Sequence, residues 1–178
     1  MPRTMEFHEV VKTRRSVRTF KPDEPDPEAM ARVLEAVRLS PSGSNRQPWK
    51  FVLVRDSEKK AEVVAACGRQ AWIAEAPIVV VACGHDIGYN RGGYMGDMSV
   101  LVDVSIAFTQ FILAARAEGL GTCWIGDFEN APIKKTLGVP DNYEVVAVSP
   151  LGYPKSDKAF HETDRRKPLL EIVGYEKF

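Results

Sequence analysis

The chain has 178 residues, of which 44% are apolar and 27% are charged, and its 24 basic side chains are balanced by 24 acidic ones. This length and composition predict one globular domain over residues 1–178, large enough to bury a core. Because the formal net charge is zero, no overall field favours nucleic acid or an anionic membrane surface. We therefore expect neither as a partner.

Targeting and redox signals are weak in this sequence. The first residues, MPRTME, contain no apolar signal region, and no later stretch is an uncharged apolar run long enough to span a bilayer. Cys67, Cys83 and Cys123 are odd in number and widely separated, which fits neither a disulfide framework nor a CxxC pair. We expect a soluble, cytoplasmic protein whose thiols lie in the core.

Two amphipathic helices are predicted in the first quarter of the chain. The first covers residues 7–14, and the second begins at Asp26-Pro27, where a capping carboxylate precedes a proline in the first turn. Its apolar stripe has the spacing i, i+3, i+4, i+7 and consists of Met30, Val33, Leu34 and Val37. It should end before Ser40-Pro41, because a residue that precedes proline disfavours helical geometry.

The middle of the chain predicts strands around a central helix. The runs 51–54 and 78–83 are continuously apolar, as in strands covered by helices on both faces. Residues 59–67 predict a helix, residues 84–96 a glycine-rich surface loop, and residues 122–125 and 143–149 short strands. The stretch from Ser99 to Glu118 is apolar nearly all round and predicts a buried helix, with Asp103, Gln110 and Arg116 arguing against a membrane span.

The signatures of several enzyme classes are missing from the sequence. It contains no GxxxxGK[ST] loop, no GxSxG elbow, and no GxGxxG turn between a strand and a helix. Phosphoryl transfer and triad hydrolysis are therefore disfavoured. His8, His85 and His161 are isolated from one another, so we expect no metal site and a structural or surface role for each histidine.

The first chemical motif is Arg14-Arg15-Ser16, with Arg18 two residues further on. It ends the first helix with three guanidinium groups and one hydroxyl. Arginine donates to phosphate oxygens through a planar fork, and serine adds a neutral donor at close range, so the group suits a phosphate. The alternative is a solvated basic helix end that interacts with the macrodipole.

The second motif is SPSGSNRQPW, residues 40–49. Ser42, Gly43 and Ser44 allow a close approach of the backbone to a ligand. The amides of Asn45 and Gln47 offer both donors and acceptors, which the edge of a heterocycle with alternating carbonyls and ring nitrogens requires. The alternative is an ordinary surface loop.

The third motif is GLGTCWIGDF, residues 119–128, where the buried helix leads into a strand and a second glycine turn. Gly126 lets the backbone approach a ligand, and a backbone N–H there could donate to a reactive ring nitrogen without a competing side chain. The alternative is a helix C-cap followed by a core strand.

These motifs, in this order and followed by Arg165-Arg166-Lys167-Pro168-Leu169, closely resemble the nitroreductase family of FMN enzymes over essentially the whole chain. The resemblance implies an α+β fold, with a mostly antiparallel sheet surrounded by helices. It also implies an intertwined homodimer with the helix 99–118 at its core and the tail 170–178 extending onto the partner. The pattern of elements alone leaves an α/β alternative open.

The resemblance also assigns site residues by position. The FMN phosphate and ribityl chain would be contacted by Arg14, Ser16 and Arg18, with Arg15 adjacent, and by Arg166 or Lys167 from the tail. The flavin would be addressed by the amides of Asn45 and Gln47, and approached from the other subunit by Pro41, Ser42 and Gly43. The strand end beside the reactive N5 atom would be Trp124, Ile125 and Gly126.

The implied activity is a ping-pong oxidoreduction in which NADH or NADPH reduces FMN, which then reduces a small nitroaromatic, quinone or similar acceptor. No side chain need be an obligatory catalyst, because the chemistry occurs at the flavin. The alternatives are a specialised flavin reaction on the same fold, such as reductive dehalogenation, and a flavin-binding protein without turnover. Larger members carry an acidic residue beside the N5 turn and an inserted excursion, whereas this chain has Ile125-Gly126-Asp127 and at most residues 84–98, which leaves the acceptor open.

Overall fold

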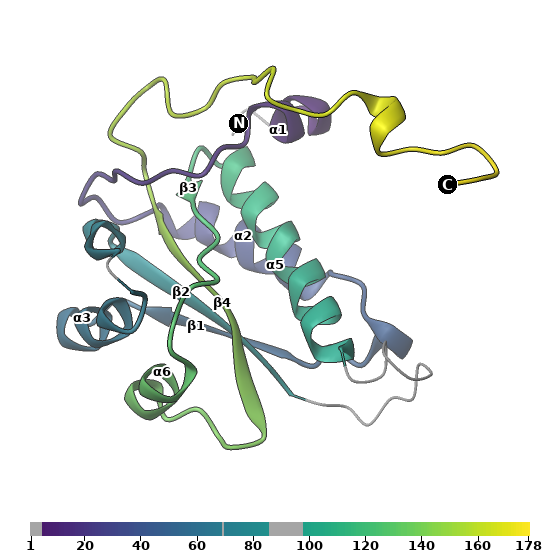
Figure 1. Cartoon of the computed structure of the whole chain (residues 1–178). Helices are drawn as coiled ribbons and strands as arrows, with labels where there is room; N and C mark the ends of the chain where they lie inside the picture. Colours follow the sequence, from purple (N-terminus) through teal and green to yellow (C-terminus); the bar gives the residue numbers. More distant parts are fainter. Residues whose placement is uncertain (1–4, 69, 86–97) are drawn as a thin grey trace.

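The computed structural model describes residues 5–68, 70–85 and 98–178 (Figure 1). Its centre is an antiparallel sheet with the strand order β1-β2-β4-β3, made of β1 (Trp49–Val54), β2 (Ile78–His85), β3 (Gly121–Thr122) and β4 (Tyr143–Gly152). The antiparallel pairing confirms the expected α+β fold and excludes the α/β alternative. Most of the predicted loop 84–96, from residue 86 on, lies outside the described residues.

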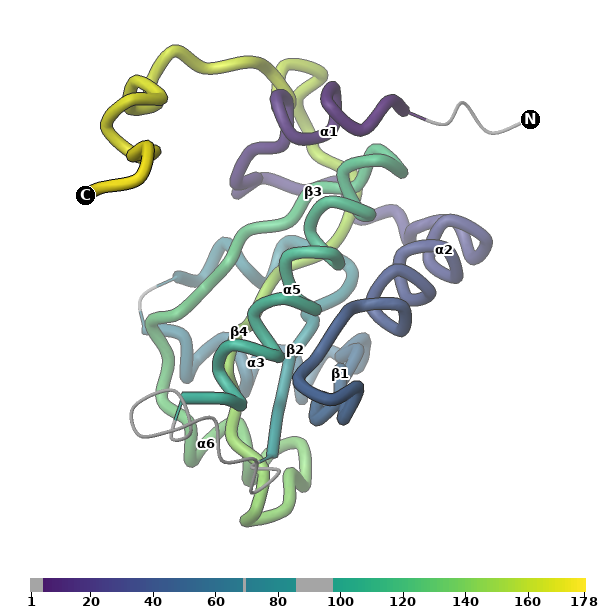
Figure 2. Tube along the Cα trace, turned by 90° about the vertical axis from the view of Figure 1, so that its right-hand side faces the viewer, coloured from purple at the N-terminus to yellow at the C-terminus, as the bar shows by residue number. Residues whose placement is uncertain are grey.

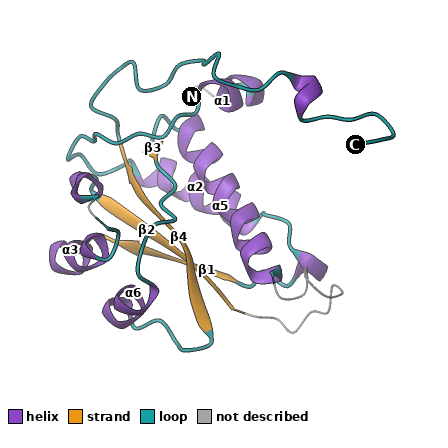
Figure 3. Ribbon diagram, in the orientation of Figure 1, coloured by secondary structure: helices purple, strands orange, loops and turns teal. Residues whose placement is uncertain are grey.

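Helices cover both faces of the sheet (Figures 1 and 3). On one face lie α2 (Pro27–Arg38) and α5 (Ser99–Ala117), and on the other lie α3 (Ser57–Ala65) and α6 (Asn130–Leu137). Alternate residues of β2 enter the two cores: Ile78, Val80 and Ala82 face α5, while Val79, Val81 and Cys83 face α3 and α6. This double burial explains the continuous apolar run of β2 and confirms that helices cover it on both sides.

The helix α5 contributes most of its buried side chains to the core between the sheet and α2. Val104, Phe108 and Phe111 are fully buried against the sheet. The helix α5 is long and apolar enough to cross a membrane. The core helices of soluble proteins often have the same length and composition. Its two buried charged residues, Asp103 and Arg116, both contact other parts of this chain, so we treat α5 as a core helix.

Local signals account for most element boundaries. The side chain of Asp26 accepts a hydrogen bond from the backbone of Ala29 at 2.9 Å, which confirms the predicted start of α2. The predicted strand 122–125 was too long: regular pairing stops at Thr122, because Cys123 donates its N–H to the Ser149 hydroxyl at 3.1 Å rather than to a strand backbone. The sequence reasoning missed α6. All three cysteines are buried and free, as expected.

The two ends of the described chain lie at the same end of the molecule, beyond the C-terminus of α5 (Figure 2). There α1 (Phe7–Thr13) lies beside the segment that follows β4. After Phe160 the chain forms only a short 3-10 helix, η3 (Leu169–Glu171), and extends away from the sheet. Its apolar side chains are exposed within the single chain: Leu169, Leu170, Ile172, Val173, Tyr175 and Phe178.

Candidate functional site

The segment Arg14–Ser16 leaves the end of α1 and runs beside β3. The N–H of Val17 donates to the carbonyl of Thr122 at 2.9 Å, and Ser16 pairs with Thr122 as an isolated parallel bridge. This approach depends on Gly121, because a Cβ atom there would lie 2.8 Å from Cβ of Val17, closer than real Cβ contacts allow. The glycine of the third motif thus brings the first motif alongside it.

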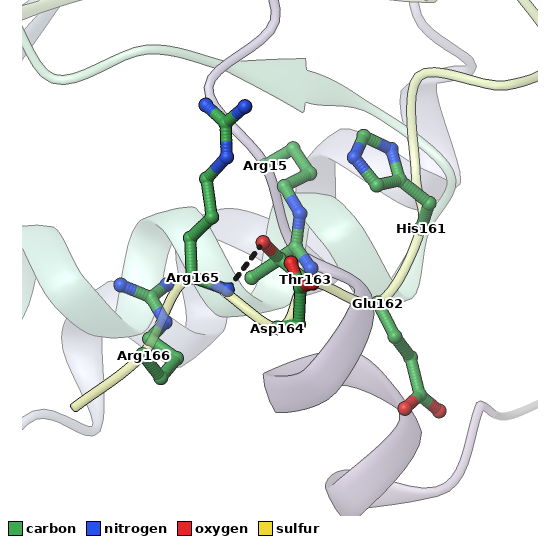
Figure 4. Close-up of a pocket in the computed structure, with 7 residues that line it drawn as sticks. All are labelled: Arg15, His161, Glu162, Thr163, Asp164, Arg165 and Arg166. Atoms are coloured by element: carbon green, nitrogen blue, oxygen red, sulfur yellow. Dashed lines mark hydrogen bonds between the residues drawn. The ribbon is translucent and has the colours of Figure 1, made fainter. Parts of the chain in front are cut away.

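Arg15 enters a hollow of about 930 Å³ whose other lining residues are 161–166. Figure 4 shows Arg15 near the middle of this group, with Arg165 and Arg166 on one side and His161 on the other. The backbone N–H of Arg165 donates to the Thr163 hydroxyl at 3.2 Å, which shapes the turn that carries both arginines. The hollow therefore joins two segments about 150 residues apart in sequence.

The hollow is lined by three arginines, Arg15, Arg165 and Arg166, and by two carboxylates, Glu162 and Asp164; within the described part of the chain no ion pair joins them. Burial lowers the pKa of Arg14, and the nearby guanidinium groups of Arg166 and Arg15 lower it further. Arg15 donates from Nη1 to the carbonyl of Arg14 at 2.6 Å, but its Nε and Nη2 are buried without any partner in the described part of the chain. Buried donors without partners are costly, so this arrangement fits an anion that offers several oxygen acceptors.

The structure divides the predicted phosphate residues into two groups. Arg15 and Arg166 line the hollow and Arg14 adjoins them, but Ser16, Arg18 and Lys167 are not among its lining residues. The Arg18 guanidinium instead lies 5.8 Å from the centre of the Trp72 ring. Arg165, which the sequence analysis placed in the tail motif without a role, also lines the hollow, and His161, Glu162, Thr163 and Asp164 were not predicted there. The signal that could have found Thr163 was a hydroxyl two residues before an arginine pair, which is weak without its neighbours in space.

The turn 124–126 follows β3, the strand that contacts Ser16 and Val17. Trp124 is half-exposed and packs edge-on against Phe108 of α5, with ring centres 4.6 Å apart. Ile125 is buried and pairs with Val148, so the turn is held against the sheet. Gly126 is exposed, and a Cβ atom there would meet only the indole nitrogen of Trp124, at 3.9 Å. The backbone at Gly126 is therefore open to a ligand.

The loop that carries the second motif holds an unusual backbone. Ser44, Asn45 and Gln47 have φ angles of 49°, 57° and 50°, in the left-handed region that favours glycine. Gln47 donates from Nε2 to the backbone oxygen of Asn45 at 2.9 Å and to its Oδ1 at 3.1 Å, and the N–H of Gly43 donates to Asp103 Oδ1 at 3.1 Å. Such strain persists only where the surroundings enforce it, and it clusters at functional sites.

Within one chain the helix α5 separates this loop from the turn 124–126. The Ser40 hydroxyl donates to Gln110 Oε1, while Trp124 packs on Phe108. Side chains two positions apart on a helix point about 200° apart, so these two contacts lie on opposite faces of α5. The predicted residues Pro41, Ser42, Gly43, Asn45 and Gln47 are therefore not brought together with the arginines of the same chain.

Comparison with known proteins identifies the family to which the chain belongs. The family model described as Nitroreductase family matches residues 11–91 and 62–153. The chain belongs to the nitroreductase family. A relative from Archaeoglobus fulgidus, provisionally named NADH dehydrogenase/NAD(P)H nitroreductase, is 37% identical over 163 residues, which cover 88% of this chain and 90% of the relative.

Other members of the family differ in the reactions for which they are named. Iodotyrosine deiodinase 1 from Sus scrofa is 28% identical over 203 residues, covering 96% of this chain and 68% of the deiodinase. The solved structure of NADPH:FMN oxidoreductase from Vibrio harveyi, complexed with NAD+, matches with a TM-score of 0.85 at 26% identity, covering 97% of this chain and 77% of that one. Membership makes this chain a flavin-dependent oxidoreductase, and the family alone does not fix its acceptor.

Proposed function

We propose that this protein is an FMN-dependent NAD(P)H oxidoreductase that reduces small electron-poor acceptors and works as a homodimer. The observation that carries the proposal is the guanidinium of Arg15, whose buried Nε and Nη2 have no partner among the described residues and lie beside the like-charged Arg14 and Arg166. A phosphate monoester would accept hydrogen bonds from these donors and neutralise the cluster. FMN carries such a group.

The residues of this chain divide the work of holding FMN. Arg14, Arg15, Ser16 and Arg166 would bind the phosphate, and the turn 124–126 would lie beside the flavin ring. Because Gly126 is open, its backbone can approach a ring nitrogen without a side chain in between. Bound FMN would supply the redox chemistry, taking hydride from NADH or NADPH and reducing a nitroaromatic, quinone or similar acceptor.

A second copy of the chain would complete the site. The outward face of α5 carries an apolar hollow of about 580 Å³, lined by Leu101, Val102, Ser105, Ile106, Thr109 and Gln110. Two-fold pairing across this face would bring one copy's loop 41–47 toward the other copy's arginines, and would give two equal sites. The strained amides of Asn45 and Gln47, with the segment Pro41–Gly43, would then reach the flavin held by the partner. The exposed apolar tail supports the same assembly.

The test is to purify the protein, release its flavin by denaturation, and identify it. We expect FMN and not FAD, because the described residues offer a single arginine cluster suited to one phosphate group and the sequence contains no second nucleotide motif. Separate assays with NADH and NADPH should then show steady oxidation in the presence of a nitroaromatic or quinone. A protein that neither contains nor binds FMN would refute the proposal.

The same assays separate the alternatives. Bound FMN without NAD(P)H oxidation, whichever acceptor is offered, would make the protein a flavin carrier. The similarity to a deiodinase keeps reductive dehalogenation as the second candidate. Halide release from a halogenated phenol, faster than nitroaromatic reduction at equal concentrations, would favour that candidate.

A further inference from the structure

Arg116 is a buried cation at the last turn of α5, and only 7% of its surface is exposed. Among the described residues no carboxylate lies within ion-pair distance of its guanidinium, and Glu9 attracts it only from further away. Burial lowers the pKa of Arg116. A buried charge without an ion partner is costly, so its remaining contacts need an explanation.

Among the described residues, Arg116 makes a hydrogen bond to one of the two segments that form the arginine-lined hollow and a cation–π contact to the other. Its Nε donates to Oγ1 of Thr13 at 3.0 Å, and its guanidinium carbon lies 4.1 Å from the centre of the Phe160 ring. Thr13 is the last residue of α1 and directly precedes Arg14-Arg15. Phe160 directly precedes the segment 161–166, which lines the hollow. One guanidinium therefore contacts the base of both segments.

We propose that Arg116 is a positioning residue that holds these two segments together, so that the arginines from both converge on one phosphate. This inference rests on the proposed FMN function. Arg116 does not line the hollow and would not touch FMN itself. Its planar guanidinium can donate from one edge while its face stacks on an aromatic ring, whereas a lysine ammonium is a point charge without a stacking face.

The inference is tested by comparing the affinities of FMN and riboflavin, which differ by the phosphate, using flavin-fluorescence titration of the flavin-free protein. Arg116→Met should weaken FMN binding about tenfold, the loss expected when a charge-assisted hydrogen bond is misaligned. Riboflavin binding should change by less than about twofold, because the turn 124–126 and the loop 41–47 are untouched. Phe160→Leu keeps most of the apolar volume and should give a smaller loss in the same direction.

Arg32→Met is the matched control, because Arg32 donates to Glu118 at the same end of α5, at 2.7 and 2.8 Å, but contacts neither Thr13 nor Phe160. It should leave both affinities unchanged. Equal losses of FMN and riboflavin in Arg116→Met would mean a general structural role, and full FMN affinity in Arg116→Lys would mean that charge alone suffices. Either result, or unchanged FMN binding in both Arg116→Met and Phe160→Leu, overturns the inference. If the wild-type protein does not bind FMN, it is the proposed function that fails.

Discussion

The sheet and the terminal segments of this protein satisfy their side chains in opposite ways. Around β2 the apolar residues are fully buried on both faces, and the buried hydroxyl of Ser149 has partners within the chain. In the segments 13–16 and 160–178, two buried nitrogens of the Arg15 guanidinium have no acceptor among the described residues, and large apolar side chains of the tail are exposed. The sheet is therefore packed within one chain, and the contrast supports the proposal that an anion and a second chain complete the terminal segments.

The largest effect should come from removing the tail after Pro168, which deletes residues 169–178. These residues bury little within their own chain, so the sheet should keep its far-UV circular dichroism. If several apolar side chains are buried between copies, at about 1.5–3 kcal/mol each, the dimer should weaken by on the order of 100-fold or more. The sedimentation coefficient and the flavin-to-protein ratio of the truncated chain should both fall. Glu176→Gln, a change in the same tail, should alter neither quantity. Unchanged values in the truncated chain would show that the tail is peripheral.

Arg15→Met should have a smaller effect, which weakens FMN binding but stabilises the flavin-free protein. Without Arg15 the phosphate loses charged donors, so the Kd for FMN should rise about tenfold to 100-fold. The flavin-free protein should become more stable, because unpartnered buried donors costing about 1–3 kcal/mol are removed, and its Tm should rise by roughly 2–4 °C per kcal/mol.

Arg55→Met is the control for this pair of measurements, because Arg55 makes only an exposed ion pair with Glu24, at 3.4 Å. Such pairs contribute little to stability. If Arg15→Met destabilised the flavin-free protein, Arg15 would have hydrogen-bond acceptors within its own chain. The contrast between the sheet and the terminal segments would then be wrong.

The smallest effect concerns two buried thiols, Cys67 just after α3 and Cys83 in β2. Burial raises the pKa of Cys67 to about 11, with the negative charge of Asp127 adding to the shift, and burial also raises the pKa of Cys83 to about 11. Below pH about 9 both thiols keep their protons whether the chain is folded or unfolded. Between pH about 9 and about 11 only the unfolded state releases them, so stability should fall as the pH rises.

The measurement is the Tm of wild type and Cys67→Ser at pH 8 and pH 10. A serine hydroxyl can donate to the carbonyl of Val63, as the Cys67 thiol does at 3.3 Å, but it does not titrate in this range. Wild type should lose about 1 kcal/mol more than the variant on going to pH 10. Equal losses in both proteins would mean that this thiol is open to solvent.

Sequence patterns predicted the fold wherever a local signal was strong. Asp26-Pro27 identified the start of α2, and the apolar stretch 99–118 identified α5 nearly to the residue. The direction of strand pairing could not be derived from β2, because burial on both faces erases the alternation that usually marks an antiparallel strand. The helix α6 was missed because it is short and buries only Ile133, although Gly138, at φ 63°, ends it in the usual left-handed cap.

The site was predictable only in parts. The sequence proposed Arg14, Arg15 and Arg166 for one anion, and the structure places them as neighbours. The contact of Arg18 with Trp72 could not be foreseen, because it depends on how the segment after α1 packs against the 3-10 helix η2 (Ala71–Glu75), which precedes β2. The role of Arg116 was not predicted for a similar reason. In sequence it is one polar residue in an apolar helix, and its contacts Thr13 and Phe160 lie 103 and 44 residues away.

Because α5 lies between the loop 41–47 and the turn 124–126, variants of the two groups should complement each other in a mixed dimer. If each flavin is held by the arginines of one copy and the loop of the other, defects in the two groups lie in different chains of any one site. A mixed dimer of Arg15→Met with a chain defective in Asn45 would then combine both defects in one site and neither in the other. Two proteins that each bind FMN weakly, unfolded and refolded together, should therefore regain wild-type FMN affinity in one of the two sites of each mixed dimer.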